Sequence, residues 1–146
     1  MCKCNKFCGN NFAISSTGIG EALQRSASAL YEAGNTIDEA IGLITAANSV
    51  VQNPENVGTA LKTLSLRLRG AKADLEDAGL ETDQMCESVS ELQAKLLALT
   101  GGKVNIMLDK DTFKSTTQIL REMSQVWDDM TDVNRADCCP YVQKCA

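Results

Sequence analysis

The sequence predicts an all-α fold of about five amphipathic helices, elongated or loosely bundled. Apolar residues recur at alternating steps of four and three over long stretches, as on one face of a packed helix. Helix-capping residues and glycines separate these stretches. Aromatic residues make up only 4% of the chain, so any core consists mainly of aliphatic side chains, which suits slender helices better than a thick sheet.

The first two predicted helices have clear boundaries. The first runs from about Thr17, its expected N-cap, to Ala33, where the dipeptide "GN" stops it. The second begins at Thr36, and Glu39 three residues later completes a capping box. It fades at "VVQN".

The third predicted helix starts at Asn53 as N-cap, has Pro54 in its first helical position and ends at Gly79. Its segment "LSLRLR" alternates as a strand does, but a longer window shows an apolar seam with helical spacing over three heptads. Gly70 within this window costs about 1 kcal/mol relative to Ala. The helix-packing seam comprises Val57, Leu61, Leu64, Leu68, Ala71, Leu75 and Ala78.

The fourth helix is expected from about Asp83 to Leu99, ending at "TGGK". A short extended piece, Val104–Leu108, then leads to Asp111, the expected N-cap of a fifth helix that continues to about Val133. The corresponding seam positions are Met85, Val89, Leu92 and Leu96 on the fourth helix, and Ile119, Met123, Val126 and Met130 on the fifth.

Composition excludes several classes of function. The chain has no histidine, which removes the commonest general base and every histidine-containing metal site. The net charge is −5, and the most basic stretch, from Arg67 to Lys72, is followed at once by acidic residues, so no nucleic-acid site is expected. No apolar run approaches the roughly 18 residues of a membrane span. The N-terminus also lacks the apolar region of a signal peptide, which predicts a reducing compartment.

The acidic and glycine-rich motifs favour structural roles. Asp109 and Asp111 form a DxD pair without the further ligands and glycine of a calcium loop. The segment "WDDMTD" has the character of a solvated acidic face, and "TGGK" lacks the first glycine and final hydroxyl of a phosphate-binding loop. No nucleophile, base and orienting group occur in a recognisable pattern. The sequence therefore predicts no enzyme and no cofactor.

Six of the seven cysteines lie near the two ends of the chain. Thiolates bind Cu(I) and Zn(II), but neither end carries the paired CxxC motifs of a strong zinc signal. An odd number of cysteines also cannot form a fully paired set of disulfides within one chain. Cys86 is expected to be an inert, partly buried thiol. The weak metal candidates are Cys2, Cys4, Cys8, Cys138, Cys139 and Cys145.

The long segments "GEALQRSASAL", "AIGLITAANSVVQNPENVGTALKTLSLRLRGAK" and "LALTGGKVNIMLDKDTFKSTTQILREMSQVWDDMTD" resemble the helical region of phage tail tape measure proteins. The resemblance covers roughly Gly9 to Arg135. It implies a structural virion-assembly protein that occupies the tail tube and sets tail length. Its partners would be tail tube and tail-assembly proteins and other tape measure copies. Its locations would be the lumen of the virion tail and, during assembly, the host cytoplasm.

The resemblance divides the chain into three parts: a cysteine-rich tail at 1–8, a helical tape-measure-like segment at 9–135 and a second cysteine-rich tail at 136–146. Tape measure proteins are very long, so the chain corresponds to a fragment of one, with tails of separate origin. The alternative is a stand-alone helical interaction protein whose cysteine tails bind metal or act as a thiol switch.

Overall fold

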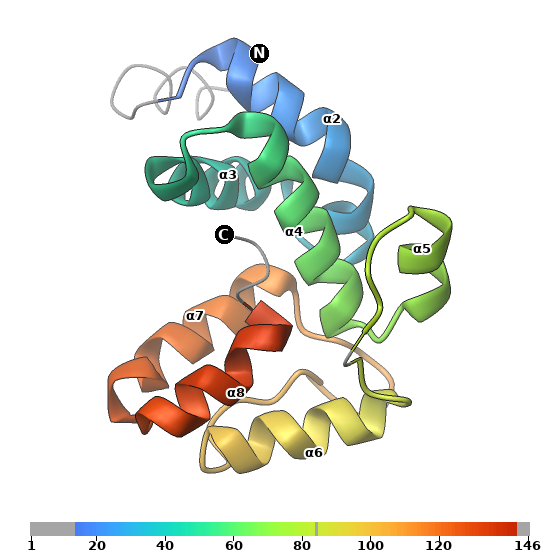
Figure 1. The fold of residues 1–146 in the computed structure, drawn as a ribbon, viewed down its shortest axis with the longest axis vertical. Helices are drawn as coiled ribbons and strands as arrows, with labels where there is room; N and C mark the ends of the chain where they lie inside the picture. Colours follow the sequence, from blue (N-terminus) through green and yellow to red (C-terminus); the bar gives the residue numbers. More distant parts are fainter. Residues whose placement is uncertain (1–13, 84, 143–146) are drawn as a thin grey trace.

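The computed structural model describes residues 14–83 and 85–142 (Figure 1). All regular structure in these ranges is helical apart from one isolated β-bridge, which confirms the predicted all-α class. Two of the five predicted helices are interrupted, so the helices are shorter and more numerous than expected. The elements are α2 (Ser16–Glu32), α3 (Ile37–Val51), α4 (Pro54–Leu68), α5 (Lys72–Asp77), α6 (Val89–Leu99), α7 (Thr116–Val126), the 3₁₀ turn η1 (Trp127–Asp129) and α8 (Asp132–Val142).

Helix α4 lies between the two halves of the molecule, with α2 and α3 around its first part and α6, α7 and α8 near its end (Figure 1). Val57 and Leu61 belong to a core with α2 and α3, whereas Leu64 and Leu68 belong to a second core with α6, α7 and α8. Leu66 joins Ala29 and Leu75 in a third, smaller cluster. One helix therefore contributes to every hydrophobic cluster in the described part of the chain.

Helices α2 and α4 pack unusually closely at Gly58. A Cβ atom built on this glycine would lie 2.6 Å from the carbonyl oxygen of Ala22 and 3.0 Å from its Cα. At the start of the same interface, Gly18 faces the Pro54 ring, which a Cβ would meet at 2.9 Å. Small residues thus let the two backbones approach each other, and the exposed ion pair between Arg25 and Glu55 spans the edge of the contact at 3.1 Å.

The helix starts at α3 and α4 were correctly predicted. Thr36 caps α3, and the Glu39 carboxylate accepts from the Thr36 backbone N–H, which completes the capping box. Asn53 caps α4, with Pro54 in its first turn. Helix α2, however, begins earlier than expected, because Ser15 rather than Thr17 accepts the capping bond, from the Gly18 N–H.

The predicted continuous helix from Asn53 to Gly79 is wrong, because α4 ends at Leu68. Gly70 adopts a left-handed conformation with φ of 65°. Its N–H donates to the Arg67 carbonyl and the N–H of Ala71 donates to the Leu66 carbonyl, which together form a Schellman C-cap. Gly70 is therefore a helix stop and not a tolerated interior glycine. Leu75 still reaches the core, but from the separate helix α5.

The fourth predicted helix also starts later than expected. Ser88, not Asp83, is the N-cap of α6, and its hydroxyl accepts from the Glu91 N–H at 3.1 Å. Glu91 in turn accepts from the Glu87 N–H at 2.9 Å, which makes residue 88 the better-capped start. The segment before it lies against the end of α4, where Arg67 donates to the Glu81 carbonyl.

Asp111 does not cap the fifth predicted helix. Residues 104–114 instead form a short hairpin-like turn in which Met107 and Phe113 pair in an isolated bridge. Helix α7 begins after Ser115, which forms a capping box with Gln118. Just before α7, the ammonium group of Lys114 contacts both carboxylate oxygens of Glu122, in the second turn of the helix, at 2.7 Å.

The same predicted helix breaks before Val133. Helix α7 tightens into η1, and Met130 is extended, with ψ of 144°. Acidic residues are unfavourable at a helix C-terminus and favourable at an N-terminus, so the aspartates of "WDDMTD" disfavour continuation but suit the start of α8 at Asp132. Arg135 holds the corner by donating to the carbonyls of Trp127 at 2.9 Å and Asp128 at 3.1 Å.

Two buried polar contacts join the N-terminal half to the start of α7. The Oδ1 atom of Asn35 accepts from the backbone N–H and the hydroxyl of Thr117, at 2.9 and 2.8 Å. Its Nδ2 atom donates to the Leu30 carbonyl at 2.8 Å. Beside it, the hydroxyl of Thr116 donates to the hydroxyl of Ser65 on α4 at 3.2 Å. These hydrogen bonds fix the orientation of α7, because apolar packing by itself does not prescribe one direction.

Cys138 ties the C-terminal region to the core. It lies on α8, is fully buried and belongs to the same cluster as Leu64 and Leu96. The predicted boundary between residues 135 and 136 therefore falls inside α8. Within the described ranges, no helix is both long and apolar enough to span a membrane.

The close α2–α4 contact predicts that Gly58→Ala destabilises the protein. The added Cβ would overlap backbone atoms of Ala22, which cannot rotate away, so we expect a loss of about 1–3 kcal/mol in the free energy of unfolding despite the better helix propensity of Ala. Gly20→Ala is the matched control, because a Cβ there meets nothing within 4 Å. Urea denaturation should show this control unchanged or more stable by up to about 1 kcal/mol. A Gly58→Ala variant as stable as the parent would contradict the packing.

The Asn35 contacts predict that Asn35→Ala destabilises the protein by about 1–3 kcal/mol, because buried polar partners on Leu30 and Thr117 lose their bonds. Thermal and urea denaturation measure this loss. Gln24→Ala, at an exposed position on α2, should change stability by no more than about 0.5 kcal/mol. Equal effects of the two substitutions would show that Asn35 does not join the two halves.

Candidate functional site

The acidic motifs take structural roles in the described chain. The Oδ1 atom of Asp109 accepts from the Asp111 N–H at 3.0 Å, and this bond, with further bonds from Thr112, lowers the pKa of Asp109. Asp129 pairs with Lys103 at 3.0 Å, and Asp132 pairs with Arg135 at 3.4 Å. Among residues 14–83 and 85–142, no three Cys, Asp or Glu side chains lie together as a metal site would require.

The cysteines differ in their environments. Cys138 is buried in the core, whereas Cys86 is half-buried in the loop before α6. Cys2, Cys4, Cys8 and Cys145 lie outside the described residues, as does the side chain of Cys139. Of the six candidate metal ligands, Cys138 is the one whose side chain the structure describes, and it packs among apolar side chains.

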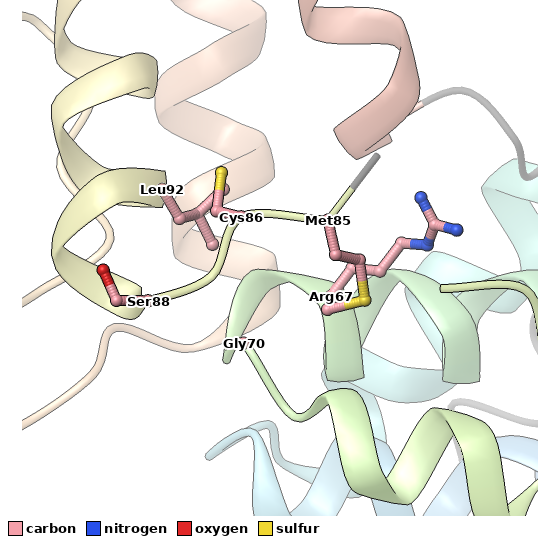
Figure 2. Close-up of a pocket in the computed structure, with 6 residues that line it drawn as sticks. All are labelled: Arg67, Gly70, Met85, Cys86, Ser88 and Leu92. Atoms are coloured by element: carbon pink, nitrogen blue, oxygen red, sulfur yellow. The ribbon is translucent and has the colours of Figure 1, made fainter. Parts of the chain in front are cut away.

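Cys86 borders a small cavity between the end of α4 and the start of α6 (Figure 2). The cavity holds only about 10 Å³, which is room for a single water molecule. Arg67 and Met85 also line it, but Figure 2 shows the Arg67 guanidinium and the Cys86 sulfur pointing in different directions. A cavity of this size has no space for a substrate.

Most of the predicted seam residues are buried, although they do not form continuous seams. Ala71 and Met85 lie outside the helices and are half-buried, and Val89 is half-buried at the start of α6. Ala78 is exposed, so its predicted place in the seam is wrong. The buried members are Val57, Leu61, Leu64, Leu68, Leu75, Leu92, Leu96, Ile119, Met123, Val126 and Met130. They are divided among three separate clusters. These residues consequently form the interior and leave the outer surface to other side chains.

Five large apolar side chains are exposed on the described surface: Tyr31, Ile37, Val50, Leu108 and Val133. Single exposed apolar residues are common and need no explanation. Tyr31 and Ile37 differ because they border the same depression. Tyr31 is 80% exposed at the end of α2, and Ile37 is 55% exposed at the start of α3. Neither lies on a predicted seam, so the seam analysis missed both.

We call this depression the α2–α3 hollow. It has a volume of about 190 Å³. Its lining is Leu23, Ala27, Leu30, Tyr31, Asn35, Thr36, Ile37 and Ala40. A second, broader depression of about 470 Å³ lies beside α6, but its lining includes Gln93, Asp109 and Lys110 and is more polar. The α2–α3 hollow is therefore the more apolar of these two depressions.

Comparison with known proteins gives one family. The family model described as "Phage-related minor tail protein" matches residues 8–139. No curated protein and no solved structure matches the chain significantly. The family match includes Cys8, the whole described helical region up to residue 139, and Cys138.

The buried position of Cys138 predicts that Cys138→Ser lowers the free energy of unfolding by about 1–3 kcal/mol, since a hydroxyl would enter an apolar cluster. Cys86→Ser at the half-buried loop position should cost less than about 1 kcal/mol. Both variants can be compared by urea denaturation under reducing conditions. Equal stabilities for Cys138→Ser and the parent would show that Cys138 is not part of the core.

Proposed function

Because the chain belongs to the family of phage-related minor tail proteins, we propose that it is a tape-measure-type structural segment that lies in the tail tube. The observation that carries this proposal is the family match over residues 8–139, which spans nearly all of the chain. The resemblance of its long helical segments to tape measure proteins supports the finer assignment. The proposed role is structural and non-catalytic, in agreement with a sequence that has no histidine.

The folded arrangement of the helices bears on how such a segment would contribute to tail length. One continuous helix of residues 14–142 would span about 190 Å at 1.5 Å per residue. In the structure α2, α3 and α4 fold back on one another, and α6, α7 and α8 do the same around the end of α4 (Figure 1). The segment would therefore contribute much less length when folded than when extended.

The tape measure role predicts that tail length follows the length of the segment. The experiment deletes or duplicates residues 14–142 in frame in the natural phage or prophage gene and measures tails by electron microscopy. We expect shorter tails from the deletion and longer tails from the duplication. A change near 190 Å would indicate an extended segment, and a much smaller change would indicate the folded form.

A scrambled-order control, in which α2–α4 and α5–α8 exchange places, keeps the residue number and should keep the length. Intact tails of unchanged length in both the deletion and the duplication would contradict the tape measure role. That outcome would leave membership of the minor tail family untouched. An epitope inserted at the exposed turn Gly101–Gly102 tests the lumen location, because antibody should bind it in disrupted tails and not in intact ones.

A further inference from the structure

The α2–α3 hollow has the size and lining of a receptor for a protruding apolar side chain. Its volume of about 190 Å³ is below the roughly 300–1,000 Å³ of small-molecule sites. Leu23, Ala27 and Leu30 line it from α2, and Ile37 and Ala40 line it from α3. A depression between two helices with apolar walls suits the apolar face of a third helix.

The rim of the hollow carries two large, exposed apolar side chains. Tyr31 and Ile37 together offer an aromatic ring and a branched aliphatic chain to solvent. Tyrosine is enriched at energetically important interface positions, because its ring buries a large area and loses little conformational freedom. Covering the exposed part of these two side chains would be favourable by the usual apolar burial term.

Residues 26–61, which include all of the hollow's lining except Leu23, carry acidic side chains and no basic ones. Between Arg25 and Lys62 the chain has no basic residue, and its charged residues there are Glu32, Asp38, Glu39 and Glu55. Glu55 already pairs with Arg25. Glu32 lies in the last turn of α2, which contains no basic residue, although the carbonyl end of a helix favours cations. Glu32 therefore places a negative charge at the carbonyl end of α2, next to Tyr31 in the sequence.

We propose that the α2–α3 hollow docks an amphipathic helix of a partner protein whose apolar stripe is flanked by lysine or arginine. A large apolar side chain of that helix enters the hollow between Tyr31 and Ile37. Basic residues beside the stripe face Glu32 and the C-terminal end of α2. The inference goes beyond the proposed function, since it specifies a binding surface and a partner chemistry and does not depend on how tail length is set.

The test uses the full chain and two synthetic helical peptides that share a leucine stripe. One carries lysine beside the stripe and the other carries glutamate at the same positions. Titration calorimetry should show saturable one-to-one binding of the lysine peptide and binding weaker by about tenfold or more for the glutamate peptide. Glu32→Gln should weaken binding of the lysine peptide and reduce its dependence on salt.

Matched double variants locate the site without changing net charge. Tyr31→Ser with Ile37→Ser should weaken the lysine peptide by about tenfold or more. Val50→Ser with Val133→Ser removes two other exposed apolar side chains elsewhere and should leave affinity within about twofold. Circular dichroism establishes that each variant is folded, and the single variant Tyr31→Ser serves as a second probe at the most exposed position.

Two results would overturn the proposal. Equal binding of the lysine peptide to the parent and to the Tyr31, Ile37 double variant would show general attraction to an acidic protein. Self-association of the parent in analytical ultracentrifugation that the same double variant abolishes would show that a second copy occupies the hollow. Neither result would affect the tail-length experiment.

Discussion

The packing of α4 is the constraint on which the rest of the structure depends. Its first half meets α2 at a distance that only a glycine at position 58 permits, and its last turns carry side chains into two further clusters. Leu64 and Leu68 belong to one cluster, whereas Leu66, which lies between them in the sequence, belongs to another. The strand-like alternation of "LSLRLR" thus reflects a helix end buried on several sides. A helix with one narrow apolar seam and a long polar back would not produce that pattern.

Local capping chemistry explains both the successes and the failures of the sequence prediction. Helices α2, α5 and α6 end at glycines that were expected stops, and each of these ends has the same pair of Schellman bonds as the end of α4. Gly70 carried the same signal, but the regular apolar spacing across it favoured an uninterrupted helix. The N-cap at Ser88 and the capping box at Ser115 also have a signal in the sequence, as serine followed three residues later by Glu91 and Gln118. The prediction instead places these helix starts at the acidic residues Asp83 and Asp111.

The contacts that set the arrangement of the halves could not be predicted from sequence patterns. Asn35 and Thr117 are 82 residues apart, and Ser65 and Thr116 are 51 residues apart. The presence of each residue can also be explained locally: Asn35 lies in a turn, Ser65 on a helix face, and Thr116 and Thr117 in the first turn of a helix. The same holds for Cys138, which belongs by composition with the cysteine-rich end but packs with the core. Periodicity identifies the buried side of a helix, whereas only the tertiary structure identifies its neighbour.

The α2–α3 hollow follows from these same contacts. The chain reverses direction at the Schellman turn of Gly34, and Asn35 bonds this turn to α7. The last turn of α2 and the first turn of α3 meet at this corner, whose position is fixed by the bond. Tyr31 and Ile37 lie on either side of this corner, and both are exposed. The acidic character of residues 26–61 is visible in the sequence alone, but it becomes informative only beside an apolar depression. A tail component must present surfaces to other components after it has folded. The part of this chain suited to that requirement lies outside the seams that stabilise its fold.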